Sequence, residues 1–130
     1  MALVTLSLAA CGGPSDTERI RSLVTDYVKA FSAGDGPKVC SLLTPAAQRE
    51  IQQAAGLLRG KDCAATITSV AKMSVAADAN AVQKFHAGNV VVDGNEAGVV
   101  IEPASPGTKP TRLVKVDGKW LFDGSVATTR

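Results

Sequence analysis

Between residues 16 and 72 the apolar positions recur with the spacing of α-helices. The clearest stripe follows Ser15, which forms the reciprocal pattern of a capping box with Glu18. Apolar side chains then recur every three or four positions up to Gly34, on one face of the expected helix: Ile20, Leu23, Val24, Tyr27, Val28 and Phe31. This pattern predicts a long first helix that buries one face and ends at the glycine.

Three shorter helices are predicted to follow. Each begins at a residue whose side chain caps free backbone amides, namely Asp35, Thr44 and Asp62. Pro45 strengthens the second of these signals, because a proline at the first helical position gives up no hydrogen bond. We expect these helices to run through residue 43, as far as Gly60, and from residue 63 to about 72.

Beyond residue 79 the pattern changes from that of helices to that of strands. Runs rich in β-branched residues predict four strands, at 82–92, 97–101, 112–116 and 119–122. The turn sequences Asp93-Gly94-Asn95 and Asp117-Gly118 adopt positive φ readily, so they predict two hairpins. Helices followed by antiparallel strands indicate the α+β class, with the helices packed on one face of the sheet.

Composition narrows the classes of function. The 130 residues are 45% hydrophobic and 20% charged, which suits one globular domain. The 14 basic and 12 acidic side chains are mixed along the chain, and one Trp, one Tyr and three Phe give few surfaces for stacking bases, so nucleic-acid binding is not expected. A single His and no Cys-x-x-Cys pair leave few metal ligands, and we expect neither a metal nor another cofactor.

The N-terminal segment resembles the leader of a bacterial lipoprotein. A mainly apolar stretch ends in Ala9-Ala10, and Cys11 follows directly, ahead of Gly12-Gly13. The resemblance implies a signal peptide at 1–10, a lipidated Cys11 with a short spacer at 11–15, and a domain at 16–130. The leader is short and carries no Lys or Arg, which leaves two alternatives open: a coding sequence that starts further upstream, or an apolar N-terminus that is not a signal.

The remaining cysteines agree with export. With Cys11 assigned to the lipid, Cys40 and Cys63 form an even pair. On the outer face of the cell membrane, where we expect an anchored domain, such a pair is expected to form a disulfide. The alternative is two buried free thiols, because Cys also packs as a small apolar residue.

Two phrases in the domain resemble the nuclear transport factor 2-like superfamily. The first is Asp26-Tyr27-Val28-Lys29-Ala30-Phe31-Ser32-Ala33-Gly34-Asp35 at the end of the first helix, followed by Val39-Cys40-Ser41-Leu42-Leu43. The second is the hairpin Asp117-Gly118-Lys119-Trp120. The resemblance spans about residues 16–125 and implies a cone-shaped domain, in which a strongly curved antiparallel sheet wraps around the helices and encloses an apolar pocket.

The resemblance also points to candidate catalytic residues. Tyr27 matches the tyrosine that, in the ketosteroid isomerases of this superfamily, donates a hydrogen bond to the oxyanion. That chemistry also needs a carboxylate base and a neutral acid, yet residues 44–48, where the base would lie, contain no carboxylate, and Glu102 is the nearest second acid. His86 is a further weak candidate, as a general acid or base oriented by Asp26 or Glu102. The alternatives are a Tyr27 that packs in the core and a His86 at the surface.

Taken together, the sequence predicts a lipid-anchored protein of the cell envelope without catalysis of its own. It would bind a small apolar ligand in the pocket or contact another envelope protein. Two other functions stay open: a small-molecule isomerase, dehydratase or SnoaL-type cyclase, and a domain that forms homodimers through its sheet. Convergence of Tyr27, His86 and a carboxylate in one pocket would favour the enzyme.

Overall fold

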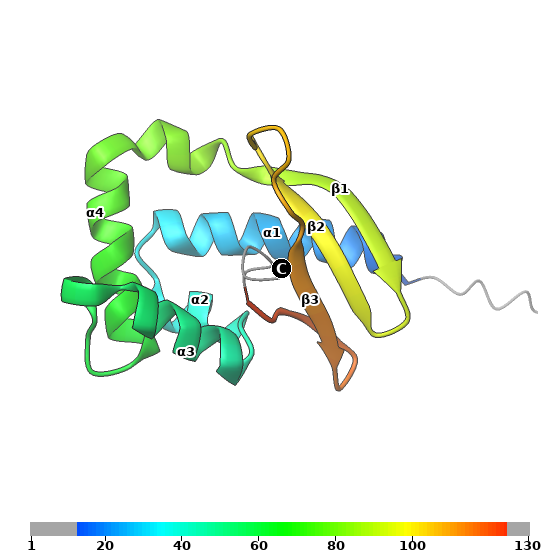
Figure 1. The fold of residues 1–130 in the computed structure, drawn as a ribbon, viewed down its shortest axis with the longest axis horizontal. Helices are drawn as coiled ribbons and strands as arrows, with labels where there is room; N and C mark the ends of the chain where they lie inside the picture. The colour runs from blue at the N-terminus through cyan, green and yellow to red at the C-terminus, as the bar shows by residue number, and fades with distance from the viewer. Residues whose placement is uncertain (1–12, 125–130) are drawn as a thin grey trace, which may run out of the picture.

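The computed structural model describes residues 13–124, so the predicted signal peptide and the predicted lipidation site at Cys11 lie outside the described residues. Helices come first and the sheet second, which confirms the α+β class (Figure 1). The elements are α1 (Asp16–Ser32), α2 (Gly36–Ser41), α3 (Pro45–Ala54), the 3₁₀ turn η1 (Gly56–Leu58), α4 (Cys63–Gln83), β1 (His86–Asp93), β2 (Glu96–Glu102), β3 (Thr111–Val116) and β4 (Lys119–Phe122). No helix of this range is both long and apolar enough to cross a membrane.

The predicted helix starts are confirmed. Ser15 and Glu18 form the capping box, with the Glu18 amide donating to Ser15 Oγ and the Ser15 amide donating to Glu18 Oε2, both at 3.2 Å. Asp35, Thr44 and Asp62 each accept a hydrogen bond from a backbone amide in the first turn of the helix that follows. Local side-chain chemistry therefore fixes where all four helices begin.

The predicted ends of the second and third helices are wrong. The second helix stops at Ser41, because the next residues pair with β4: the Phe122 amide donates to the Leu42 carbonyl at 2.9 Å, and Leu43 forms a bridge with Phe122. The third stops at Ala54 and not at Gly60, because Gly56 adopts a φ of 56° that no α-helix contains.

The fourth helix is longer than predicted and takes the place of the start of the first strand. It runs to Gln83, since the alanines at 76, 77, 79 and 81 are the strongest helix formers. It kinks at Asp78, whose φ of −162° and ψ of 92° are not helical and whose carboxylate accepts from the Ala81 amide at 3.0 Å. Asp78 thus caps a last turn that contains Val82, so the prediction that the first strand begins at Val82 is wrong.

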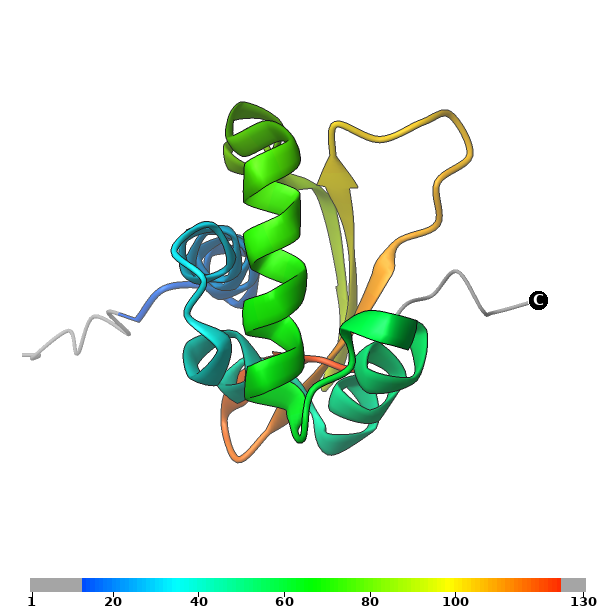
Figure 2. The same ribbon diagram turned by 90° about the vertical axis from the view of Figure 1, so that its left-hand side faces the viewer.

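The four strands form one antiparallel sheet in the order β1-β2-β3-β4. Both predicted hairpins are confirmed: Asp93 pairs with Glu96 around Gly94, and Val116 pairs with Lys119 around Asp117 and Gly118, which have φ of 49° and 76°. α1 packs against β1 and β4 of this sheet, which is open and not strongly curled (Figure 2). The strongly curved, cone-forming sheet that the resemblance implied is therefore not what these four strands form.

A β-bulge in β1 sets which residues of this strand face the core. Strict alternation would put His86 on the same face as Val90. The register instead shifts between Ala87 and Val90, so that two residues on β1 oppose one on β2. Ala87 consequently joins Val90 against the core, and His86 is exposed.

The core lies between α1, α2, α4 and the helix-facing side of the sheet. Its most deeply buried side chains come from both halves of the chain: Ile20, Val24, Val39, Thr66, Ile67, Val99 and Leu113. Thr66, the polar member of this set, donates from Oγ1 to the Asp62 carbonyl and accepts from the Gly60 amide, both at 2.8 Å. Both partners are backbone groups at or just before the start of α4, so the buried hydroxyl is satisfied and a polar residue is tolerated there.

The predicted disulfide between Cys40 and Cys63 is present, with the two Cα atoms 6.2 Å apart. It joins α2 to the first residue of α4. The same two helices approach closely at Gly36, where a Cβ atom would overlap the backbone carbonyl of Ala64. The bridge and the glycine together hold α2 against α4.

Asp16 ties the start of α1 to the hairpin of β3 and β4. Its Oδ1 atom accepts hydrogen bonds from Trp120 Nε1 and Lys115 Nζ, each at 3.0 Å. The bond from Trp120 and then that from Lys115 favour the carboxylate, so the pKa of Asp16 lies below its usual value of 3.8.

Candidate functional site

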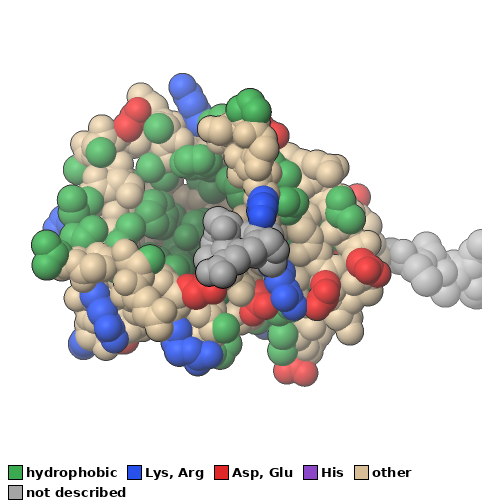
Figure 3. Space-filling view, viewed as in Figure 1, with side chains coloured by type: hydrophobic (Ala, Val, Ile, Leu, Met, Phe, Trp, Pro, Cys, Tyr) green, Lys and Arg blue, Asp and Glu red, His purple; other side chains and the backbone are tan. Residues whose placement is uncertain are grey.

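An apolar cavity of about 570 Å³ lies between α1, α3, α4 and the sheet. Figure 3 shows the face of the molecule on which this cavity opens, with hydrophobic side chains around the hollow. Its size falls within the range of about 300–1,000 Å³ that is typical of small-molecule sites. Apolar side chains from distant parts of the chain line it, among them Val24, Phe31, Ile51, Val82, Phe85, Ile101 and Phe122.

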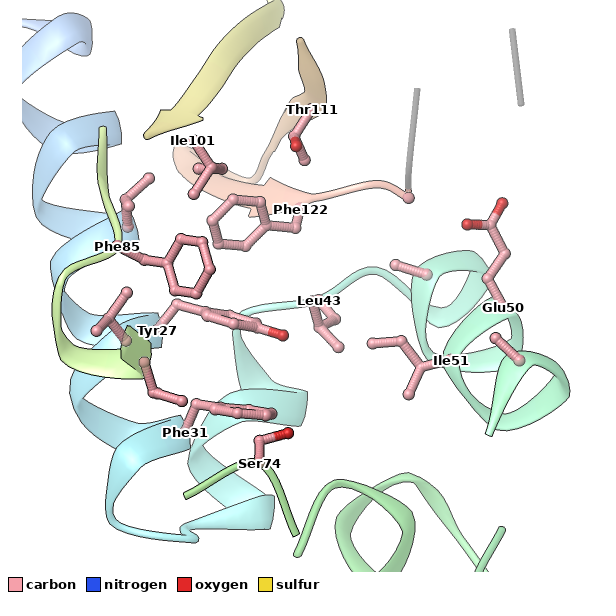
Figure 4. Close-up of a pocket in the computed structure, with 16 residues that line it drawn as sticks. Tyr27, Phe31, Leu43, Glu50, Ile51, Ser74, Phe85, Ile101, Thr111 and Phe122 are labelled. Atoms are coloured by element: carbon pink, nitrogen blue, oxygen red, sulfur yellow. The ribbon is translucent and has the colours of Figure 1, made fainter. Parts of the chain in front are cut away.

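Tyr27 lies on the α1 side of this cavity. Its ring stacks on Phe31 with centroids 6.0 Å apart and meets Phe122 edge-on at 5.3 Å. Its hydroxyl points into the open space (Figure 4) and makes no hydrogen bond to another group among residues 13–124. Burial raises the pKa of Tyr27, so the group facing the cavity is a neutral hydroxyl at physiological pH.

Three further polar residues line the cavity: Glu50, Ser74 and Thr111. Ser74, on α4, lies beside Phe31, while Glu50, on α3, lies across the cavity from Tyr27 (Figure 4). Neither Glu50 nor Ser74 is among the site residues predicted from the sequence. Glu50 could have been found, because it lies at helical spacing from Ala47 and Ala54; Ser74 could not, because the helix that carries it was expected to stop at residue 72.

The structure does not bring the predicted catalytic residues together. Tyr27 lines the cavity, but His86 is exposed, and its Nδ1 atom lies 2.9 Å from the Lys84 carbonyl oxygen. Asp26 lines a different, more polar groove with Arg19, and the Glu102 side chain lies against Gly88. Neither predicted orienting carboxylate therefore shares the cavity with Tyr27.

The chemistry available in the cavity is therefore limited. Tyr27 and Glu50 are the titratable groups among its described lining residues, and their side chains lie on opposite sides (Figure 4). A general acid and base must both reach the reacting atoms, whereas these two groups flank a broad apolar surface. Residues 13–124 also contain no group of three or more His, Cys, Asp or Glu that could hold a metal ion. The arrangement suits the binding of an apolar molecule with a hydrogen-bonding group.

Comparison of the chain with protein-family models, with curated proteins and with solved structures found no match. The resemblance to the nuclear transport factor 2-like superfamily consequently stays a prediction. What the structure establishes is an α+β architecture.

Proposed function

We propose that this protein is a non-catalytic binding module that takes up a small apolar molecule in the cavity between its helices and its sheet. The observation that carries the proposal is the cavity itself: about 570 Å³, lined mainly by apolar and aromatic side chains, with the Tyr27 hydroxyl directed into it. Removing apolar surface of a ligand from water at such a wall is favourable by about 25 cal/mol per Å².

The position of Ser74 offers a direct test. Ser74→Phe would fill part of the cavity, whereas Met73→Phe adds the same side chain at the neighbouring, 58% exposed position on α4. We expect the full chain to bind the neutral fluorescent probe N-phenyl-1-naphthylamine, Ser74→Phe to weaken binding about tenfold or more, and Met73→Phe to leave it unchanged. Circular dichroism controls for folding. Absence of probe binding, or equal effects of the two variants, would rule out the cavity as a binding site.

We also propose that the domain is a nuclear transport factor 2-like domain attached to the outer face of the cell membrane through a lipid on Cys11. Support for the superfamily comes from the order of helices and hairpins and from the placement of Tyr27. Support for export comes from the apolar leader before Cys11 and from the disulfide between Cys40 and Cys63. Three residues between Cys11 and Ser15 reach about 10 Å when extended, which would keep the domain close to the bilayer.

Intact mass spectrometry of the protein, expressed in a bacterial host with its native upstream sequence, tests the anchor. Processing at Cys11 with added acyl mass is the expected result, together with the loss of two hydrogens for the disulfide. An unprocessed and unmodified chain would contradict the anchor and the extracytoplasmic location.

Homodimerisation through the sheet is the second candidate function. Val91 on β1 and Val116 on β3 are 60% and 45% exposed, and burying these side chains between two copies of the domain would favour association. Sedimentation velocity at micromolar concentration tests it, and a monomer under these conditions would count against it.

A further inference from the structure

A second, more polar groove lies between α1, α2 and the hairpin of β3 and β4. Each of these three parts of the fold contributes one basic side chain to it: Arg19 from α1, Lys38 from α2 and Lys119 from β4. All three residues are exposed. The tertiary structure therefore gathers on one concave surface three positive charges that lie far apart in the sequence.

Ion pairs within the chain do not neutralise these three cations. All 12 acidic residues of the sequence lie between Asp16 and Asp123, within the described residues, and none of them forms an ion pair with the three basic side chains. Asp26 is the acidic member of the described groove lining, so positive charge exceeds negative charge there. Asp16, which lies near Arg19, already accepts hydrogen bonds from Lys115 and Trp120. An anion that entered the groove could therefore form charge-assisted hydrogen bonds with cations from three elements.

The groove lies near the point from which the chain leads to Cys11. A Cβ atom on Gly13 would lie 3.7 Å from Arg19 Nη2, so Gly13 is beside this guanidinium. The two residue steps from Gly13 to Cys11 span about 7 Å at most, so a lipid on Cys11 would enter the bilayer close to the groove. Membranes that contain anionic lipids attract Lys and Arg side chains held near their surface.

The groove and the apolar cavity use different faces of α1. Ser22 and Asp26 line the groove, whereas Tyr27 and Phe31 line the cavity. The Ser22 hydroxyl adds a further hydrogen-bond donor to the basic side chains of the groove. A lipid headgroup in the groove would therefore not occupy the cavity.

We infer that this groove binds the phosphate-bearing headgroup of an anionic phospholipid in the leaflet that holds the Cys11 anchor. The inference rests on the proposed anchor and adds to it a second contact with the bilayer. A lipid on a short tether attaches the domain but leaves it free to rotate, whereas a charged contact determines which face meets the membrane. The two contacts together orient the domain with the groove toward the bilayer.

Sedimentation with vesicles tests the inference. The full chain with Cys11→Ser, which cannot be lipidated at this position, is mixed at low ionic strength with vesicles of phosphatidylcholine, with or without phosphatidylglycerol. We expect binding to be about twentyfold or more stronger with phosphatidylglycerol, because each basic side chain near an anionic surface contributes about fivefold. Added salt should reduce this preference, because it screens charges at a surface. Residues 1–12 contain no charged side chain, so the apolar leader does not account for the preference.

Two triple variants that remove the same number of positive charges locate the preference on the molecule. The groove variant replaces the three basic residues of the groove: Arg19→Gln, Lys38→Gln and Lys119→Gln. The control variant replaces three exposed lysines outside the groove: Lys61→Gln, Lys72→Gln and Lys84→Gln. We expect the groove variant to lower the preference about tenfold or more and the control variant to lower it less than about threefold. Asp26→Asn should instead strengthen binding to anionic vesicles, and circular dichroism controls for folding of every variant.

Equal effects of the two triple variants would overturn the groove as the binding site, because only net charge would then matter. Equal binding of the unmutated groove to both kinds of vesicle would overturn the inference in favour of an acidic protein segment as the occupant. The intact mass of the processed protein tests the anchor separately. An unmodified Cys11 together with a groove-dependent preference would contradict the anchor alone, whereas a lipidated Cys11 without that preference would contradict this inference alone.

Discussion

Reduction of the disulfide between Cys40 and Cys63 should lower the free energy of unfolding by an amount that depends on the number of residues in the loop that the disulfide closes. The two cysteines are 23 residues apart. In the chain-entropy model a loop of this length restricts the unfolded chain enough to contribute about 3.4 kcal/mol at 25 °C. Both side chains are buried, at 8% and 6% exposure, so a reductant reaches them mainly when α2 separates from α4.

Urea unfolding followed by circular dichroism, with and without reductant, measures this contribution. With a slope of about 1.5 kcal/mol per M, the midpoint should fall by about 2 M on reduction. All samples carry Cys11→Ser, so that a third thiol cannot exchange with the bridge. The double variant Cys40→Ala, Cys63→Ala in the same background is the control, and reductant should not change its midpoint.

A change in midpoint of less than about 0.5 M on reduction of the bridged protein would refute this reasoning. It would mean either that the two cysteines are free thiols in the folded protein or that the unfolded chain is already compact around them. Intact mass before and after alkylation distinguishes the two cases, because only free thiols in the unreduced protein are alkylated.

Three further predictions concern the contacts that hold the fold together. Asp16→Asn should lower the urea midpoint at pH 7. Because the pKa of Asp16 is lowered in the folded state, the carboxylate stabilises the fold fully above its usual pKa and loses this effect as the pH falls through the lowered value. The difference in midpoint from wild type should therefore shrink below about pH 4, and Trp120 fluorescence should change over the same range. If the difference is the same at pH 7 and pH 2, the ion pair is not its source. Gly36→Ala should lower the free energy of unfolding, measured by thermal unfolding, by about 1–3 kcal/mol, because the alanine methyl group would overlap the backbone of α4. An unchanged melting temperature would show that α2 and α4 lie further apart. Leu113→Ala, at a fully buried site, should lower the free energy of unfolding by about 2–5 kcal/mol. Leu57→Ala, at a fully exposed site, should leave it almost unchanged. Equal decreases for the two variants would contradict the assignment of the core.

The local signals in the sequence were sufficient to place the starts of the helices and the turns of the sheet. Ser15 and Asp62 cap helices, and Gly118 permits a tight turn, because each acts on backbone groups only a few residues away. The ends of elements were less predictable. α2 ends where Leu42 and Leu43 meet β4, a partner about 80 residues further along the chain, and no local pattern contains that contact.

The same distinction between local signals and long-range contacts applies to the candidate site. The sequence by itself determined that Tyr27 lies on the buried face of the first helix and that Cys40 and Cys63 can pair, since helical periodicity and an even count of cysteines are properties of the chain. Only the tertiary structure decided that His86 points away from the cavity, because one extra residue in β1 reverses the alternation of side chains. It likewise brought Glu50 and Ser74 to the cavity of Tyr27, since a cavity is formed by the packing of separate elements and is encoded in none of them alone.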